Sequence, residues 1–177
     1  MTALFERESA LGAIDAALRR ASEGGSGVLA LVGEAGLGKT TLLARCLEGG
    51  RSFRTAHVVC SEIEGSIPFG VLDRLLGRAG LAIAPLRDHE GRRLSHHPGD
   101  ARVRRYEQLL DWLGNGVEGP MLLAVDDLHW ADPDSIELLC LMCRRLERVP
   151  VTVIVTVRPF PRTAIEQAML LAYDGIA

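Results

Sequence analysis

Apolar residues along the chain alternate between short runs and longer stretches with helical spacing. Short apolar runs are typical of strands that are buried on both faces of a sheet. Such strands are predicted at residues 28–32, 56–60, 121–125 and 151–157. Elsewhere apolar residues recur at three- and four-residue intervals, as on one face of an amphipathic helix. Helices are predicted at residues 7–22, 39–48, 68–78, 134–147 and 163–171, with a further one that begins at Asp100.

Some helix boundaries are predicted from residues that favour helix ends. Pro68 is tolerated in a first helical turn and is expected to open the helix that ends near Arg78. Asp100 is expected to cap the next helix, because its side chain can accept a hydrogen bond from a free N–H group. The apolar side of that helix is predicted to consist of Val103, Tyr106, Leu110 and Leu113. Residues 80–99 show no periodicity, which indicates a long exposed loop.

The alternation of buried strands and helices indicates a parallel sheet with helices on both faces. The predicted fold class is therefore α/β, as a three-layer sandwich with a mainly parallel sheet. A length of 177 residues suits one domain, or part of one large domain, and not two complete domains. Ligands of open α/β sheets bind at the carboxyl ends of the strands, so candidate chemistry is expected there.

Composition and charge restrict the class of protein. Hydrophobic residues make up 47% and charged residues 24%, which is typical of a globular domain and excludes a disordered tail. A net charge of −3 argues against a domain whose main role is to coat nucleic acid. The N-terminus lacks the apolar core of a signal peptide, and the uncharged run at 149–157 is about half as long as a membrane span. A cytoplasmic protein without a membrane partner is expected.

The cysteines and histidines give weaker signals. Cys140 and Cys143 match Cys-x-x-Cys, but they lie in an apolar helical run without a second pair. They are interpreted as buried hydrophobic residues, with a zinc or redox site as the alternative. The arginine-rich segment 87–105 also contains acidic residues and is interpreted as a solvated surface rather than a nucleic-acid site. Within it, His96 and His97 lack metal-binding partners at a useful spacing.

The most specific short motif lies between the first predicted strand and the next helix. Residues 33–40 (GEAGLGKT) fit the pattern G-x-x-x-x-G-K-[ST]. Its glycines let backbone N–H groups point at phosphate oxygens, and the helix directs its N-terminal dipole at the same charge. Lys39, the only lysine in the chain, is expected to reach the β- and γ-phosphates, and Thr40 to bind Mg²⁺. The residues expected to bind the nucleotide are Gly33, Glu34, Ala35, Gly36, Leu37, Gly38, Lys39, Thr40 and Thr41.

Further candidates follow the third and fourth predicted strands. Asp126 and Asp127 come directly after the apolar run at 121–125. A phosphate loop needs a neighbouring carboxylate for Mg²⁺ and for the attacking water, so Asp126 is the metal candidate and Asp127 the water-polarising candidate. Arg158 follows the fourth strand and is expected at the same edge, where it can sense the γ-phosphate. The alternatives are a turn with two solvated aspartates, and an arginine that is solvated or paired with an acidic residue.

The sequence from Asp126 onward also resembles a specific family. The run DDLHWADPDSIELL at residues 126–139 is similar to the Walker B segment of STAND-type AAA-related ATPases, as found in large ATP-binding LuxR-type transcriptional regulators. The residues LFERE at 4–8 are similar to that family's entry motif, and residues 151–159 resemble its sensor strand. The resemblance covers nearly the whole chain.

This resemblance implies a P-loop NTPase fold that takes ATP and Mg²⁺ and acts as a regulatory switch. By resemblance, Lys39 and Asp127 support hydrolysis, Arg158 acts as a sensor, and Arg7 and Glu8 lie near the adenine end of the nucleotide. His129 is interpreted as structural, whereas Trp130 either packs under the following helix or contacts a ligand.

Members of the family continue with a fifth core strand, a lid and often a DNA-binding domain. Residues 1–177 are therefore expected to be the N-terminal part of an ATPase domain, with no DNA-binding element in this stretch. Three hypotheses remain open. The chain is an ATP-hydrolysing switch that acts with a protein partner or by self-association, a nucleotide-binding interaction module without hydrolysis, or a truncated fragment.

Overall fold

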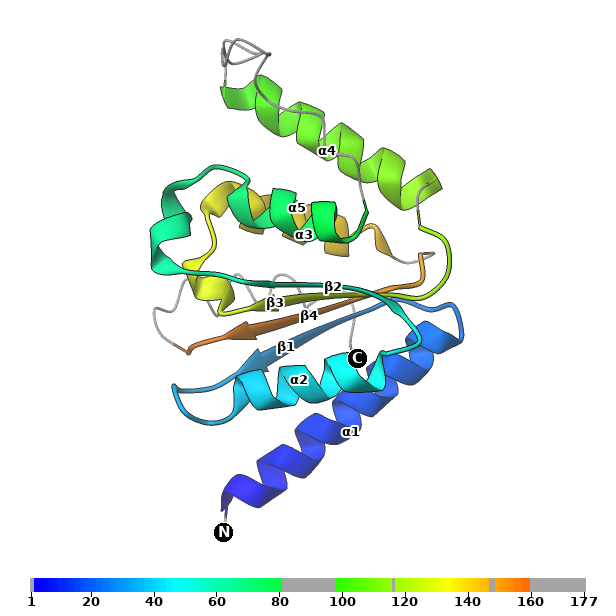
Figure 1. The fold of residues 1–177 in the computed structure, drawn as a ribbon, viewed down its shortest axis with the longest axis vertical. Helices are drawn as coiled ribbons and strands as arrows, with labels where there is room; N and C mark the ends of the chain where they lie inside the picture. Colours follow the sequence, from blue (N-terminus) through cyan, green and yellow to red (C-terminus); the bar gives the residue numbers. More distant parts are fainter. Residues whose placement is uncertain (1, 81–97, 116, 147–148, 160–177) are drawn as a thin grey trace.

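The computed structural model describes residues 2–80, 98–115, 117–146 and 149–159. Its centre is a four-stranded, fully parallel sheet with the strand order β1-β4-β3-β2. The strands are β1 (Gly27–Val32), β2 (Arg54–Val59), β3 (Met121–Asp126) and β4 (Val151–Val157). The carboxyl ends of β1, β3 and β4 meet at one edge of the sheet (Figure 1). The predicted α/β class and parallel sheet are confirmed.

Helices cover both faces of the sheet, which gives three layers (Figure 1). One face carries α1 (Thr2–Ser22) and α2 (Lys39–Gly49). The other carries α3 (Gly70–Arg78) and α5 (Pro133–Cys143), and α4 (Pro98–Asn115) packs against α5 on the side away from the sheet. Two 3₁₀ turns, η1 (Glu62–Ser66) and η2 (Leu128–Trp130), follow β2 and β3.

The central strands are buried on both faces, as their continuous apolar runs predict. All residues of β3 and β4 are buried, and alternate side chains enter different cores. Leu123 and Val153 face the core under α3, α4 and α5, whereas Leu122 and Ile154 face the core under α1 and α2. The edge strands β1 and β2 are each exposed at their carboxyl ends.

Several predicted boundaries are wrong by a few residues. Pro68 lies in a turn and does not open α3, because Phe69 adopts a left-handed backbone conformation (φ 62°) that cannot continue into a helix. Because α4 begins at Pro98, Asp100 lies in its first turn and is not the cap. Helix α5 ends at Cys143 instead of residue 147, and a turn then leads toward β4.

The predicted apolar side of α4 is also incorrect in part. Val103 is 56% exposed, whereas Leu109, Trp112 and Leu113 are buried in the core. The buried side is thus rotated from the predicted one, because packing against α5 selects which apolar residues are covered. Most of the loop predicted at 80–99, including His96 and His97, and the helix predicted at 163–171 lie outside the described residues.

Cys140 and Cys143 lie on α5 as predicted, and Cys143 is buried, whereas Cys140 is only half-buried. All four cysteines have free thiols, and burial raises the pKa of both α5 thiols. Raised pKa values disfavour the thiolate that metal binding and redox exchange require. None of the helices in the described ranges has both the length and the apolar content of a membrane span.

A buried carboxylate fixes α3 and α5 to each other. Asp132 is 1% exposed and caps α5, where its Oδ1 accepts a hydrogen bond of 2.8 Å from the Ser135 N–H. The same carboxylate accepts bonds from the N–H groups of Phe69 (2.8 Å) and Val71 (3.3 Å) at the start of α3. The Ser135 hydroxyl accepts another bond of 2.9 Å from the Leu72 N–H. These bonds satisfy donors at two helix starts.

Asp132→Ala is expected to lower the free energy of unfolding by about 3 kcal/mol, because it leaves buried N–H groups without acceptors. Urea unfolding followed by circular dichroism measures the change. Asp15→Ala, at an exposed position on α1, is the control, and its effect is expected to be below about 0.5 kcal/mol. Equal effects of the two substitutions would contradict this account of Asp132.

Candidate functional site

The glycine-rich loop joins the end of β1 to the start of α2, at the carboxyl edge of the sheet. Gly36 (φ 81°) and Gly38 (φ 78°) both adopt the left-handed conformation that glycine tolerates best. Gly38 occupies the cap position of α2 and has no side chain to fill the space over the first helical turn. The free N–H groups of that turn and the positive end of the helix dipole therefore face the loop.

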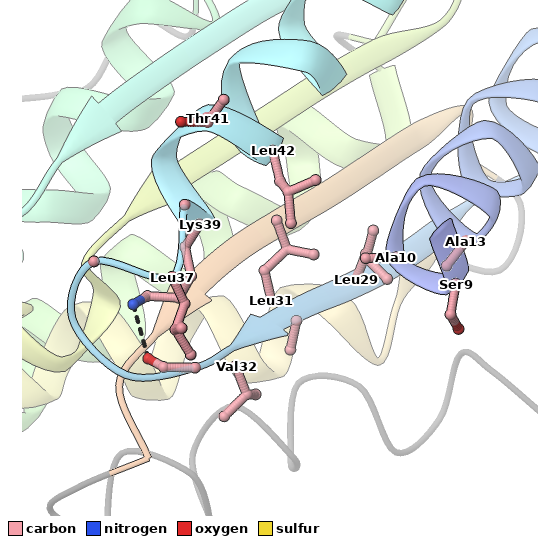
Figure 2. Close-up of a pocket in the computed structure, with 14 residues that line it drawn as sticks. Ser9, Ala10, Ala13, Leu29, Leu31, Val32, Leu37, Lys39, Thr41 and Leu42 are labelled. Atoms are coloured by element: carbon pink, nitrogen blue, oxygen red, sulfur yellow. Dashed lines mark hydrogen bonds between the residues drawn. The ribbon is translucent and has the colours of Figure 1, made fainter. Parts of the chain in front are cut away.

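Lys39 folds back over this loop. Its Nζ donates hydrogen bonds to the backbone oxygens of Gly33 (2.7 Å) and Glu34 (2.8 Å), as Figure 2 shows for Gly33. The only lysine of the sequence is thus at the centre of the glycine-rich loop. Its positive charge and the α2 N-terminus together favour an anion there.

Asp126, at the end of β3, holds α2 and β4 together. Its Oδ2 accepts a hydrogen bond of 3.0 Å from the Thr40 hydroxyl, and its Oδ1 accepts one from the Thr156 hydroxyl. The Thr156 oxygen in turn accepts a bond of 2.8 Å from the Asp127 N–H. Asp126 is only 3% exposed, so the two threonines supply hydrogen bonds that water would otherwise provide. Thr40 and Asp126 place a hydroxyl and a carboxylate side by side, which are ligands that suit Mg²⁺.

Asp127 and His129 lie beside this network. Asp127 has a left-handed backbone (φ 56°), so the chain turns sharply after β3, and its side chain is 30% exposed. The His129 side chain is 3% exposed, and its Nδ1 lies 3.9 Å from Oδ1 of Asp127. Neither ring nitrogen of His129 has a hydrogen-bond partner among the described residues.

Burial lowers the pKa of His129, and this effect outweighs the nearby Asp127 carboxylate, which raises it. The positive charges of Arg158 and Lys39 lower the pKa of His129 further. At neutral pH the imidazole is therefore uncharged, and its approach to Asp127 is not an ion pair. Arg158, half-buried directly after β4, has an Nε atom that is buried without a partner in the described part of the chain.

A cavity of about 790 Å³ opens next to the glycine-rich loop (Figure 2). The small residues Ser9, Ala10 and Ala13 of α1 form one side, and the β1 edge and the first turn of α2 form the others. Two exposed apolar side chains, Val32 (49%) and Leu37 (62%), line it near the loop. The cavity therefore combines mostly apolar walls with the glycine-rich loop and the Lys39 charge at one end, and its volume is typical of small-molecule sites.

Comparison with known families agrees with this geometry. The AAA ATPase domain family matches residues 3–155, which is most of the chain. The chain belongs to this family. Nucleotide binding and hydrolysis are the activities that the name of the family describes.

A related protein and two similar structures are all longer than this chain. An uncharacterized protein of Rhizobium meliloti (strain 1021) is 26% identical over 194 aligned positions, which cover 88% of this chain and 18% of that protein. Cdc6p from Pyrobaculum aerophilum is similar with a TM-score of 0.59 at 14% identity, over 93% of this chain and 43% of that one. The ORC1 protein of Aeropyrum pernix, solved in complex with DNA, has a TM-score of 0.58 at 16% identity, over 94% of this chain and 43% of that one. At these identities the two structures support the P-loop NTPase fold alone.

The structure of this AAA ATPase domain brings together most of the predicted site residues. Lys39, Thr40, Asp126, Asp127 and Arg158 all lie at the carboxyl edge of the sheet. The remaining loop residues, from 33 to 38, connect β1 to α2, and residue 41 lines the cavity. Of the two side chains predicted to lie near the adenine end, the one at position 7 is outside the described part of the chain.

Sequence reasoning missed two features of the site. Thr156 holds both aspartates of the 126–127 pair, and its only sequence signal is a hydroxyl in an otherwise apolar strand. His129 is interpreted from sequence as structural, and the structure places it close enough to Arg158 and Lys39 for their charges to affect its pKa. The sequence could not indicate this, because its neighbours come from three separate segments.

The lowered pKa of His129 predicts a pH dependence of stability. As pH falls below the ordinary value of 6.5, the unfolded chain gains a proton that the folded chain resists, so the free energy of unfolding falls. His129→Gln removes this difference. Between about pH 7.5 and 5.5, the variant is expected to lose less stability than wild type, by at most about 1.4 kcal/mol per pH unit.

Urea unfolding at several pH values measures how the free energy of unfolding of wild type and of the His129→Gln variant changes with pH. His57, whose pKa is also lowered by burial, is unchanged in both proteins and contributes equally to their slopes. Parallel stability curves for wild type and variant would contradict the assignment to His129.

Proposed function

We propose that this AAA ATPase domain binds Mg·ATP at the glycine-rich loop and the adjoining cavity, and that slow hydrolysis resets it as a regulatory switch. The arrangement of Lys39, Thr40 and Asp126 carries the proposal. It combines a cation held against the glycine-rich loop with a hydroxyl and a carboxylate 3.0 Å apart at the start of α2. A fold of this class accepts many ligands, so the site chemistry and not the fold supports the assignment.

The roles of individual residues follow from where they lie. The N–H groups of the loop at residues 34–38 and of the first turn of α2 bind the phosphates, with Lys39 as the positive charge at the β- and γ-phosphates. The Gly33 N–H donates to the Val157 oxygen at 3.2 Å, so Gly33 contributes through the turn of its backbone. Thr40 and Asp126 hold Mg²⁺, which neutralises phosphate charge when it is bound. The partly exposed Asp127 orients water, and Arg158 senses the γ-phosphate from β4. The apolar cavity wall beside α1 takes the adenine, and Arg7 is assigned to this end of the nucleotide from the sequence resemblance.

The wider role is proposed from the sequence resemblance. The DDLHWADP and LFERE segments support a STAND-type subtype, as in LuxR-type transcriptional regulators, in a cytoplasmic signalling or transcriptional protein. The chain spans 18% of its Rhizobium meliloti relative and 43% of the two similar structures, so it is proposed as one part of a larger activity. Residues 1–177 would be the N-terminal part of the ATPase domain, with a protein partner or self-association as its output.

Lys39→Ala is expected to weaken Mg·ATP binding at least about 100-fold, because it removes the charged donor at the phosphates. Calorimetric titration of the 177-residue chain measures the affinity. Arg45→Ala removes the same charge from an exposed position on α2 and is expected to leave the affinity unchanged. Unchanged affinity in a folded Lys39→Ala variant would overturn the proposed site.

Asp126→Asn and Asp127→Asn separate metal binding from hydrolysis. The first substitution is expected to remove the dependence of ATP affinity on Mg²⁺, because it replaces a carboxylate ligand. The second is expected to keep the affinity and to lower phosphate release at least about 100-fold. Phosphate release at the wild-type rate by Asp127→Asn would contradict its role. ATP binding by wild type without any release would instead indicate the non-catalytic interaction module.

A further inference from the structure

Strand β2 is an edge of the sheet, with β3 on one side and no strand of the described residues on the other. The N–H groups of Arg54 and Cys60 donate to the oxygens of Pro120 (3.1 Å) and Asp126 (2.9 Å) on the β3 side. Backbone groups alternate along a strand, so residues 55, 57 and 59 direct their N–H and C=O groups away from β3. Such a row of outward-facing groups on an edge strand can pair with a strand from another molecule.

Two arginines of α3 occupy outward-facing carbonyl oxygens of this edge. Arg78 donates from Nη1 to the oxygen of His57, and Arg74 donates from Nη2 to the oxygen of Val59 at 3.0 Å. The spacing explains why two arginines fit. Four helical residues advance about 6 Å and two strand residues about 6.6 Å, so side chains one turn apart meet alternate carbonyls.

Other contacts also hold α3 in place. Its N-terminal N–H groups are bound by Asp132 and Ser135, and its buried side includes Leu72 and Leu75. The two arginines therefore add hydrogen bonds to the edge from a helix that is already in place. They also place positive charge over the free side of β2.

We propose that Arg74 and Arg78 form an edge clasp that prevents β2 from pairing with β2 of a second copy of this chain. The sequence of β2, RTAHVV, is rich in residues that favour strands, and Val59 is 49% exposed at its end. Without the clasp, the carbonyl oxygens of residues 57 and 59 are free to accept bonds from another strand. With the clasp in place, pairing of two copies would require each chain to release its two guanidinium groups from the β2 carbonyl oxygens. It would also bring the four positive charges of the two copies close together.

The clasp is tested with the double variant Arg74→Ala/Arg78→Ala in the 177-residue chain. Light scattering after size-exclusion chromatography is expected to give at least twice the apparent mass of wild type at the same concentration. The control is Arg45→Ala/Arg104→Ala, which removes the same charge from exposed positions on α2 and α4 and should match wild type. The single variant Arg74→Ala, which keeps the bond from Arg78, is expected to give an intermediate mass and serves if the double variant does not fold.

A rescue substitution identifies the surface that associates. The N–H group of Thr55 faces away from β3, so Thr55→Pro removes no hydrogen bond of the sheet but blocks pairing at the edge. Added to the double variant, it is expected to restore the wild-type mass. Slower hydrogen exchange at residues 54–59 in the associated form would agree with edge pairing. A folded clasp variant with unchanged mass, or association that Thr55→Pro does not reduce, would overturn the proposal.

Discussion

The arrangement of the site depends on one buried carboxylate at the end of the central strand β3. Asp126 is surrounded by protein, and leaving it without hydrogen bonds would cost several kcal/mol. Thr40 and Thr156 satisfy it from α2 and from β4. The glycine-rich loop ends where α2 begins, so the loop is positioned by the same bonds that satisfy Asp126. A change in Asp126 would therefore affect the start of α2 and the end of β4 together.

A second buried, hydrogen-bonded carboxylate, Asp132, follows six residues later and lies on the opposite side of the sheet. Asp132 is as buried as Asp126, but its partners are N–H groups at the starts of α3 and α5. The end of β3 and the segment after it therefore carry two carboxylates, one facing the start of α2 and one fixing the helices of the other layer. The 3₁₀ turn η2 lies between the two aspartates. Gly65 of η1 packs closely against η2: a Cβ atom at position 65 would lie 3.2 Å from the Trp130 oxygen. This segment links both layers to the site.

Sequence alone could predict those features that arise from local patterns. The buried strands follow from continuous apolar runs, and the place of the glycine-rich loop between β1 and α2 follows from its glycine spacing, because both depend on neighbours in the chain. The bonds from Asp132 to the start of α3, the threonine at 156 and the side of α4 that is buried depend on partners more than 20 residues away. The prediction that Pro68 opens a helix is wrong for a related reason. The turn before α3 is fixed by the distant Asp132, whose carboxylate accepts a hydrogen bond from the Phe69 N–H.

The hydrogen bonds of Lys39 and Thr40 suggest why a switch is a suitable role for this site. In the proposed complex, Lys39 would exchange the oxygens of Gly33 and Glu34 for phosphate oxygens, and Thr40 would exchange Asp126 for Mg²⁺. Binding would thus replace existing bonds instead of adding partners to unsatisfied groups, so the net gain is smaller than the number of new contacts implies. Because Asp126 also holds Thr156 at the end of β4, next to Arg158, the same exchange would reach the proposed sensor. Two alternative sets of bonds on one group of residues are what a two-state element requires.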